Sequence, residues 1–249
     1  MFSNYKDAFS HIDLERRNGI LQMRLHTDGG PLRWGFRNND SVHAQLGEAF
    51  YRIARDPDNR VLILTGTGNE FLTAVDEEDL QEGEQGVEFW DRMTREGSDI
   101  LRNFLDVGAI VISAVNGPVT FHPELPTMAD MVVASDTAVF ADKHMSLGAV
   151  PGDGAHIWWS MLLGPNRGRS FLLTSEHISA AEAKQLGFVM EVVPQARTLP
   201  RAWEIAESFV HHPPVVLRNT RAVLTQDIKR RLLNDLQLGF SLESLAALK

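Results

Sequence analysis

The spacing of apolar positions in the first part of the chain predicts a hairpin followed by a helix. Two short segments within residues 12–25 flank Asn18-Gly19, a dipeptide suited to the positive φ angles of a tight turn. Further on, apolar side chains recur with a helical period of about 3.6 residues. These positions are Val42, Leu46, Ala49, Phe50 and Ile53. We expect Asp40 to cap this helix and Asp56-Pro57 to follow its end.

Two continuous apolar runs, residues 61–64 and 109–115, are typical of strands that are covered on both faces. The segment 87–105 between them is expected to be helical, and short strands are expected at 131–134 and 138–140. Strand, loop and helix therefore alternate along the chain, and this order predicts an α/β layered architecture.

A short helix and one more strand follow. Ser179 and Glu182 have the spacing of a capping box, so a helix should begin after Ser179 and end at Gly187. Residues 188–193 are then expected to return to the sheet.

The C-terminal part has a helical pattern from Leu199 onward, with Pro213-Pro214 separating two segments. An apolar stripe near the end consists of Leu232, Leu236, Phe240, Leu245 and Leu248. Such a stripe can pack on the core or on a neighbouring subunit. We therefore predict a core over residues 1–195 and a helical segment over residues 196–249.

Composition limits the chemistry that the chain can perform. Its 249 residues are 43% hydrophobic, which is enough to bury a substantial core. It contains no cysteine, so disulfides and thiolate catalysis are excluded, and the commonest ligands of structural zinc are missing. Catalysis would have to use oxygen and imidazole groups.

Charge and hydropathy make nucleic acid and membrane partners unexpected. The formal net charge is −9, whereas phosphate binding needs a clustered basic surface. The basic run at residues 229–231 is flanked by Asp227 and Asp235 and is expected to lie on a solvated helix face. No window approaches the roughly 18 apolar residues of a membrane span, and the N-terminal residues have no apolar stretch of signal-peptide length. We expect a cytoplasmic protein.

Three segments that follow predicted strands carry the candidate chemistry, namely residues 65–79, 116–126 and 140–156. In the second, His122 precedes Pro123, where a helix is expected to begin. The positive end of that helix would favour a neutral imidazole that donates an N–H to a carbonyl oxygen. A histidine that only satisfies the local backbone is the alternative.

In the third segment His144 and Asp153 lie on either side of a glycine-containing turn that can fold the chain back on itself. A carboxylate that contacts the imidazole would fix its tautomer and make it a competent general base for water. An exposed polar pair without a function remains the alternative.

Three more residues could reach the same site. Glu243 is the acid in a strongly apolar run near the C-terminus, either on a helix surface or, if that helix folds over the site, behind His122. Trp34 and His43 flank the first predicted helix and could line an apolar pocket. A metal site built from His122, His144, Asp153 and His156 is not expected, because no HExxH or comparable ligand spacing is present.

Four strings of the sequence resemble, in order and spacing, the signature blocks of the crotonase (enoyl-CoA hydratase/isomerase) superfamily. They are VLILTGTGNEF, AIVISAVNGPV, ADMVVASDTAVF and LGAVPGDGAH. The resemblance extends from Ile12 to the final helix. It implies a spiral of ββα units with C-terminal helices that complete a homotrimer, often paired into a hexamer. Typical members bind acyl-CoA thioesters and hold an enolate between two backbone N–H groups.

The sequence departs from that pattern at the catalytic positions. Phe121, His122 and Pro123 stand where the family usually has consecutive glycines, and an alignment without gaps puts Leu125 and His144 at the two hydratase glutamates. Thr73-Ala74-Val75 likewise replaces a glycine-containing motif. Hydration chemistry would thus lack both of its acids.

The strings NGPVT-x-HPE-x-P and VPGDGAH resemble a narrower group, the 6-oxocamphor and β-diketone hydrolases. The resemblance implies a catalytic His144–Asp153 dyad, a carbonyl-binding His122 and a supporting Glu243. It also implies a substrate pocket lined by His43, Trp34 and Phe121, although Trp34 matches only with an insertion. The expected reaction is retro-Claisen hydrolysis of a cyclic 1,3-diketone without metal or organic cofactor. An acyl-CoA hydratase, isomerase or thioesterase and a non-catalytic scaffold are the rivals.

Overall fold

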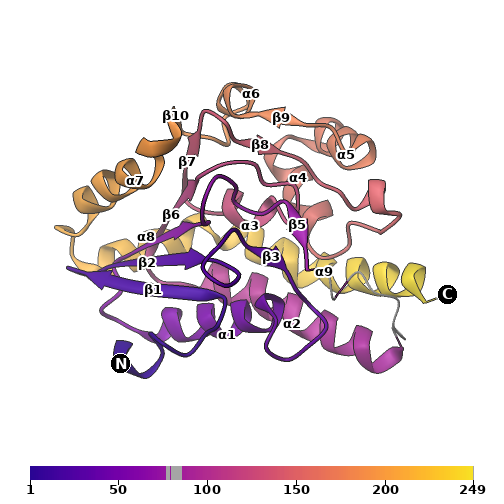
Figure 1. The fold of residues 1–249 in the computed structure, drawn as a ribbon, viewed down its shortest axis with the longest axis horizontal. Coiled ribbons are helices and arrows are strands. Elements are labelled where there is room, and N and C mark those ends of the chain that lie inside the picture. The colour runs from indigo at the N-terminus through magenta and orange to yellow at the C-terminus, as the bar shows by residue number, and fades with distance from the viewer. Residues whose placement is uncertain (77–78, 80–85, 249) are drawn as a thin grey trace.

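The computed structural model describes residues 1–76, 79 and 86–248, which form a layered α/β fold (Figure 1). Its main sheet has the strand order β1-β2-β4-β6-β7-β10, in which β1 and β2 pair antiparallel and the other neighbours pair parallel. The bounds are Ile12–Arg17 (β1), Ile20–Leu25 (β2), Val61–Thr65 (β4), Ile110–Val115 (β6), Met131–Ser135 (β7) and Glu191–Val193 (β10). The predicted α/β layered class is confirmed.

The N-terminal hairpin forms as predicted from its turn residues. Asn18 and Gly19 have φ angles of 52° and 82°. Strands β1 and β2 are paired along their whole length: Arg17 lies opposite Ile20 next to the turn, and Ile12 lies opposite Leu25 at the far end. Positive φ at both central residues is what a two-residue turn of type I′ requires.

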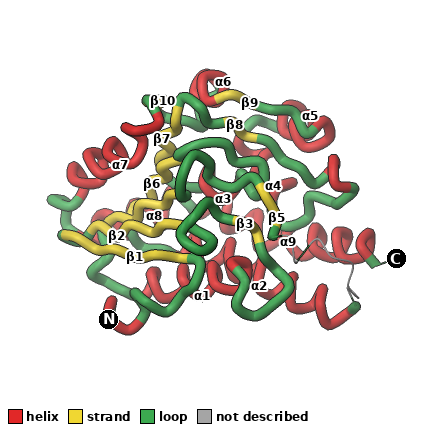
Figure 2. The backbone as a smooth tube through the Cα atoms, in the orientation of Figure 1, coloured by secondary structure: helices red, strands yellow, loops and turns green. Residues whose placement is uncertain are grey.

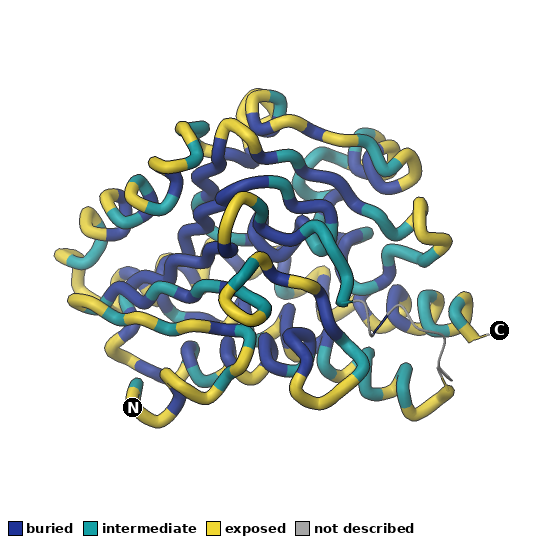
Figure 3. The backbone as a smooth tube through the Cα atoms, in the orientation of Figure 1, coloured by how far each residue is buried: buried dark blue, intermediate teal, exposed yellow. Residues whose placement is uncertain are grey.

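Strands β4 and β6 separate two apolar layers, which explains their uninterrupted apolar sequences. Leu62 and Leu64 belong to the larger core, whereas Val61 and Ile63 pack in a second core with helix α7 (Gln195–Phe209). Successive side chains of a strand point to opposite faces, so both sets must be apolar. Figure 3 shows the buried strands at the centre of the molecule with the exposed positions around them.

A second layer is made of shorter extended segments (Figure 2). Strand β3 (Arg33–Trp34) pairs with β5 (Ala74–Val75), and β8 (Val139–Phe140) pairs with β9 (Ile178–Ser179). Single bridges join Leu72 to Val119 and Val119 to Phe140. Each of β4, β6 and β7 is therefore followed by a segment in this second layer, which is the path of the expected ββα spiral.

Helices cover the sheet on both sides. Those before residue 195 are α1 (Val42–Arg55), α2 (Val87–Asp106), α3 (Glu124–Thr127), α4 (Ala155–Leu162), α5 (Pro165–Thr174) and α6 (Ala180–Gln185). The Ser179 half of the predicted capping box of α6 is present, since Ser179 Oγ accepts from the Glu182 N–H at 3.2 Å, while Glu182 Oε1 accepts from Arg167. The predicted cap of α1 was wrong by one position, because Ser41 rather than Asp40 accepts from the Ala44 N–H.

The C-terminal part differs from the prediction in its divisions. It contains α7, α8 (Pro214–Leu224) and α9 (Gln226–Ala247), so a third helix begins after Thr225. Helix α7 starts at Gln195, ahead of the expected Leu199, and β10 is shorter than the strand expected over residues 188–193. Helix α9 packs against α2 and α4. Among the described residues, no helix has both the length and the apolar character required to cross a bilayer.

The apolar stripe of α9 is only partly buried. Leu232, Leu236 and Phe240 are buried, whereas Leu245 and Leu248 are 67% and 45% exposed. The stripe therefore faces the core over the middle of α9 and leaves it near the C-terminus.

Candidate active site

A cavity of about 400 Å³ lies between the second layer, α2 and α9. Its apolar wall includes Phe36, Val75, Phe89, Met93 and Phe240. All seven residues singled out from the sequence line it, namely Trp34, His43, Phe121, His122, His144, Asp153 and Glu243. Of the first candidate loop, residues 77 and 78 lie outside the described part of the chain.

Elements from the whole chain supply these side chains. Trp34 ends β3, and His43 is in the first turn of α1. His122 and His144 follow β6 and β8, and Asp153 precedes α4. His122 has a φ of 44°, a left-handed conformation that is uncommon outside glycine and turns the chain sharply before Pro123.

Close backbone contact brings α9 over the cavity. A Cβ on Gly152 would collide with the carbonyl of Gly239, and a Cβ on Gly239 would collide with the carbonyl of Gly152. Only glycine at both positions permits this approach. Phe240 and Glu243 reach the cavity because the helix crosses the turn so closely, as expected if the C-terminal helix folds over the site.

Asp153 lies between the two central imidazoles. Its Oδ2 is 3.1 Å from Nδ1 of His122 and 3.4 Å from Nε2 of His144. The two rings stand almost perpendicular, with centroids 6.0 Å apart. The three side chains are 12–19% exposed, so they meet at the cavity wall in a largely desolvated setting.

Two further carboxylates contact these rings, and the sequence indicated neither: Glu124 shares Nδ1 of His122 with Asp153, whereas Asp142 holds the nitrogen of His144 opposite to Asp153. Glu124 Oε1 lies 2.9 Å from Nδ1 of His122, and Glu124 is 3% exposed. Asp142 Oδ1 lies 3.0 Å from Nδ1 of His144 and also accepts the His144 backbone N–H at 3.1 Å. Each acid is two residues from its histidine, so a local acid–histidine spacing was the available signal.

These contacts shift the pKa values of both histidines upward. Burial alone would lower the pKa of His122, but the charge of Glu124, the hydrogen bond to it and the nearby charge of Asp153 raise it to about 10. Burial likewise opposes the charged form of His144, whereas the charge of Asp153 and the hydrogen bond to Asp142 hold its pKa well above the ordinary value. The histidines in turn outweigh burial at Asp153, whose pKa is held well below the usual range.

The prediction that a helix dipole would keep His122 neutral was wrong. Helix α3 has four residues and its end supplies only a partial charge, whereas two carboxylates lie within 3.1 Å of Nδ1. The expectation that Glu243 orients His122 also fails among the described contacts, where Glu124 and Asp153 hold Nδ1.

Glu243 lines the cavity with a buried Oε2 that has no hydrogen-bond partner among the described residues. Burial, reinforced by the charge of Asp153, raises the pKa of Glu243 to about 8. At neutral pH this carboxyl is therefore largely protonated and can donate a hydrogen bond to a ligand in the cavity.

Trp34 and His43 form the wall behind His122. The Trp34 ring lies 4.1 Å from the His122 ring between centroids and 5.7 Å from the His43 ring. His43 Nδ1 lies 2.8 Å from Glu96 Oε2, and burial lowers the pKa of His43 despite that carboxylate. The Trp34 indole thus reaches the site, although residues are inserted between Trp34 and His43 relative to the related hydrolases.

One group of three ligands, His122, Glu124 and Asp153, is close enough together to hold a metal ion within the described chain. Their separations of 2.9 and 3.1 Å fit a protonated imidazole that donates to Glu124 and is ion-paired with Asp153. His156 from the sequence-derived metal set is not in this group, because its Nδ1 faces the carbonyl of Pro151 at 3.0 Å.

The family model for enoyl-CoA hydratase/isomerase matches residues 17–244. The chain belongs to the enoyl-CoA hydratase/isomerase family. Curated relatives include carnitinyl-CoA dehydratases from Salmonella typhi and Salmonella paratyphi A, each 33% identical over 173 residues. That alignment covers 69% of this chain and 66% of each relative, just under two thirds of its length.

Solved structures of this family superimpose on almost the whole chain. A β-diketone hydrolase from Anabaena sp. PCC 7120, bound to (S)-3-oxocyclohexyl acetic acid, is 40% identical, with a TM-score of 0.92 and coverage of 99% of this chain and 96% of that one. An enoyl-CoA hydratase/isomerase from Mycobacterium paratuberculosis is 25% identical, with a TM-score of 0.89 and coverage of 98% and 96%. The expected crotonase fold is confirmed.

The positions where this family member departs from the hydratase pattern have different surroundings. Leu125 is 2% exposed in the core, whereas His144 lines the cavity. Two cavity residues that the sequence did not indicate are Trp90, whose buried Nε1 has no partner among the described residues, and Lys143, whose Nζ lies 4.9 Å from the Phe121 ring centroid. The site of this crotonase-family enzyme thus combines a largely apolar wall with polar groups that include His122, His144, Asp153 and Glu243.

Proposed function

We propose that the protein is a β-diketone hydrolase that cleaves a carbon–carbon bond of a cyclic 1,3-diketone by retro-Claisen hydrolysis. The observation that carries the proposal is the bridging carboxylate of Asp153, which lies 3.1 Å from one imidazole and 3.4 Å from another at the wall of one apolar cavity. One imidazole can act on water while the other binds a ketone oxygen.

In the proposed reaction His144 takes a proton from water as the oxygen attacks one carbonyl carbon. The tetrahedral intermediate then breaks the bond to the carbon between the carbonyls. That electron pair moves into the enolate of the second ketone, and a proton returns to carbon. One diketone and one water thus give one keto acid, and Asp153 stabilises the positive charge on His144 during the transfer.

His122 binds the ketone oxygen that becomes the enolate. A charged imidazole placed where negative charge develops stabilises the transition state more than the ground state. The protonated carboxyl of Glu243, whose pKa is raised to about 8 by burial, is a second candidate donor to the same substrate. Trp34 packs on the His122 ring and keeps it facing the cavity.

Asp142 is assigned a positioning role at His144. It is fully buried and accepts from both Nδ1 and the backbone N–H of His144, so the ring cannot rotate freely. With its proton on Nδ1 held by Asp142, neutral His144 presents a basic Nε2 on the Asp153 side.

The cavity and the comparison support the proposed substrate class. A volume of about 400 Å³ with a largely apolar wall suits a compact cyclic diketone. The homologue from Anabaena was solved with a cyclic keto acid, which has the chemistry of such a product. A 2,2-disubstituted dione fits best, because it cannot enolise between its carbonyls.

Acyl-CoA chemistry is the second candidate, favoured by the 33% identity to carnitinyl-CoA dehydratases. Two observations oppose it. Leu125 and His144 stand at the positions where hydratases have their catalytic glutamates. Pro123, which precedes Glu124, has no backbone N–H to donate. The two functions predict different ligands, and one experiment separates them.

A panel of monocyclic and bicyclic 1,3-diketones, followed by acid release in a pH-stat, tests the proposal. We expect turnover of several diones with one equivalent of acid each, no hydration of an enoyl-CoA, and no retention on immobilised CoA. Inactivity on every dione, or turnover of the enoyl-CoA, would contradict it.

We also propose that the C-terminal helices join copies of the chain into a trimer or a pair of trimers. Outward apolar residues gather on α8 and α9 and are 49–72% exposed in the single chain. They include Val215, Val216, Val223, Leu224, Leu233 and Leu238. Patches of this kind mark contact surfaces.

Light scattering should therefore give a mass of three or six chains of 27.8 kDa. The double change Leu233→Glu and Leu238→Glu should shift the protein toward monomers, because it buries charge in the proposed interface. A monomeric wild type would rule out the proposal.

A further inference from the structure

We infer that Glu124 is a positioning residue that holds the second proton on His122 and thereby makes this imidazole a charged, two-sided donor. This inference rests on the proposed function for its catalytic meaning, although the protonation of His122 can be measured without any substrate. Glu124 would then do for one histidine what Asp142 does for the other.

The first support is geometric. Both Glu124 and Asp153 approach Nδ1 of His122, but only Glu124, at 2.9 Å, meets hydrogen-bond geometry; Asp153 lies 3.1 Å away as an ion pair. The single Nδ1 proton therefore points to Glu124. Asp153 Oδ2 is left for Nε2 of His144, which it faces at 3.4 Å.

The second support is the burial of Glu124. The residue is 3% exposed, it starts the short helix α3, and its Oε2 has no hydrogen-bond partner among the described residues. A buried carboxylate of this kind is costly unless a cation compensates it. His122 is the cation in contact, with Nδ1 2.9 Å from Glu124 Oε1.

A small separate cavity behind the site belongs to the same group. It has a volume of about 30 Å³, room for one water molecule, and its wall includes Glu124, His122, Asp153 and His43. Trp34, His43, His122 and Asp153 line both cavities, whereas Glu124 lines only the smaller one.

The protonation of His122 decides whether its Nε2 can donate a hydrogen bond to the substrate. A neutral imidazole whose Nδ1–H is donated to Glu124 would carry no proton on Nε2 and could not donate to a ketone. With the Nδ1 proton held by Glu124, the charged form of His122 also carries a proton on Nε2, and this Nε2–H can bind the developing enolate. This charged donor would replace the backbone N–H groups that the glycines of the family supply.

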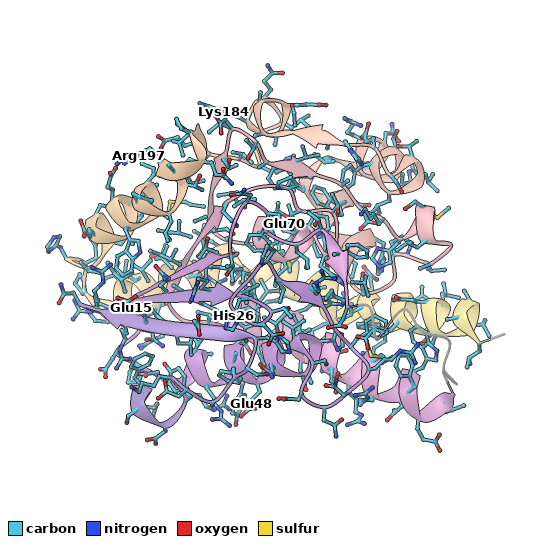
Figure 4. All side chains as sticks on the ribbon, viewed as in Figure 1. Glu15, His26, Glu48, Glu70, Lys184 and Arg197 are labelled. Atoms are coloured by element: carbon cyan, nitrogen blue, oxygen red, sulfur yellow. The ribbon has the colours of Figure 1, made fainter. Side chains whose placement is uncertain are left out.

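The test compares Glu124→Gln with Glu48→Gln, which removes the same charge from an exposed position on α1 (Figure 4). The protein is labelled with ¹⁵N-histidine, and the ring of His122 is assigned by its loss in His122→Asn. In wild type and Glu48→Gln we expect His122 to stay doubly protonated from pH 6 to pH 9. In Glu124→Gln its second proton should be lost within that range.

The kinetic readout is the pH profile of dione hydrolysis. We expect Glu124→Gln to lower kcat by about 10- to 100-fold, as with other partners that orient a functional imidazole, and to move the alkaline limb of kcat/KM to lower pH. Lower activity with an unchanged limb and an unchanged His122 titration would reduce Glu124 to a structural role and overturn the inference.

Asp153→Asn provides a second measurement if Glu124→Gln does not fold. His122 should keep its second proton in Asp153→Asn, because Glu124 remains. Loss of that proton would identify Asp153 as the holder and refute the inference. If no dione is hydrolysed by wild type, the proposed function fails, while the NMR comparison still decides the role of Glu124.

Discussion

Replacing His144 by alanine is expected to lower kcat for dione hydrolysis by about 10²- to 10⁴-fold, the usual contribution of a positioned general base. The reason is that His144 is the imidazole held by Asp142 on one side and faced by Asp153 on the other. Steady-state rates of acid release measure the effect. The matched control is His177→Ala, an exposed histidine between α5 and β9. Equal rates for His144→Ala and wild type would remove the base from the mechanism.

The direction in which the same rate changes with pH can also be predicted. The charge of Asp153 and the bond to Asp142 hold the pKa of His144 well above 6.5, which favours the charged ring in the free enzyme. Base catalysis needs the neutral ring, and kcat/KM should therefore rise with pH through a pKa above 6.5. Asp142→Asn should move this rising limb to lower pH.

Replacing His122 by alanine is expected to lower kcat and kcat/KM together by about 10²- to 10³-fold, as for loss of a donor to a developing oxyanion. The interaction strengthens as the enolate forms, so KM should change little. Rates at saturating and at low dione concentration separate the two parameters. A raised KM with unchanged kcat would assign His122 to ground-state binding instead.

The raised pKa of His122 also predicts how stability depends on pH. The pKa is 6.5 for an ordinary histidine and about 10 in the folded protein. Because the folded value is higher, the stabilisation is complete below pH 6.5 and is lost as pH rises to 10. Urea unfolding of wild type should show this loss, and His122→Ala should show a smaller one over the same window.

Local sequence patterns predicted the elements whose environment is uniform. Residues 61–64 and 109–115 were recognised as strands because both faces of β4 and β6 are covered by apolar layers. The hairpin followed from two residues that tolerate positive φ. Element ends were less well determined, since Ser41 and Asp40 are adjacent and either can cap a helix.

The sequence predicted which residues line the site but not all of the contacts between them. The motif strings identified His122, His144 and Asp153, which do meet at one cavity. They did not identify Glu124 or Asp142, because whether an acid two residues away contacts a ring depends on backbone angles such as the φ of 44° at His122. The protonation of His122 was predicted wrongly for the same reason, since the nearby full charges outweigh a short helix.

The position of Glu243 depends on packing between distant segments. Its helix reaches the cavity because Gly152 and Gly239 allow two backbones to touch. No local pattern contains that contact. From the sequence alone, Glu243 could therefore lie either on a helix surface or over the site, and no local pattern distinguished the two.

The central claim is that one imidazole acts on water while the other holds the ketone, with Asp153 between them. The most direct measurement is a crystal structure with (S)-3-oxocyclohexyl acetic acid, the ligand of the homologue from Anabaena. The account predicts the ring ketone oxygen within hydrogen-bond distance of Nε2 of His122 and the carboxylate beside His144. A ligand bound in the opposite direction, or outside the cavity, would contradict it.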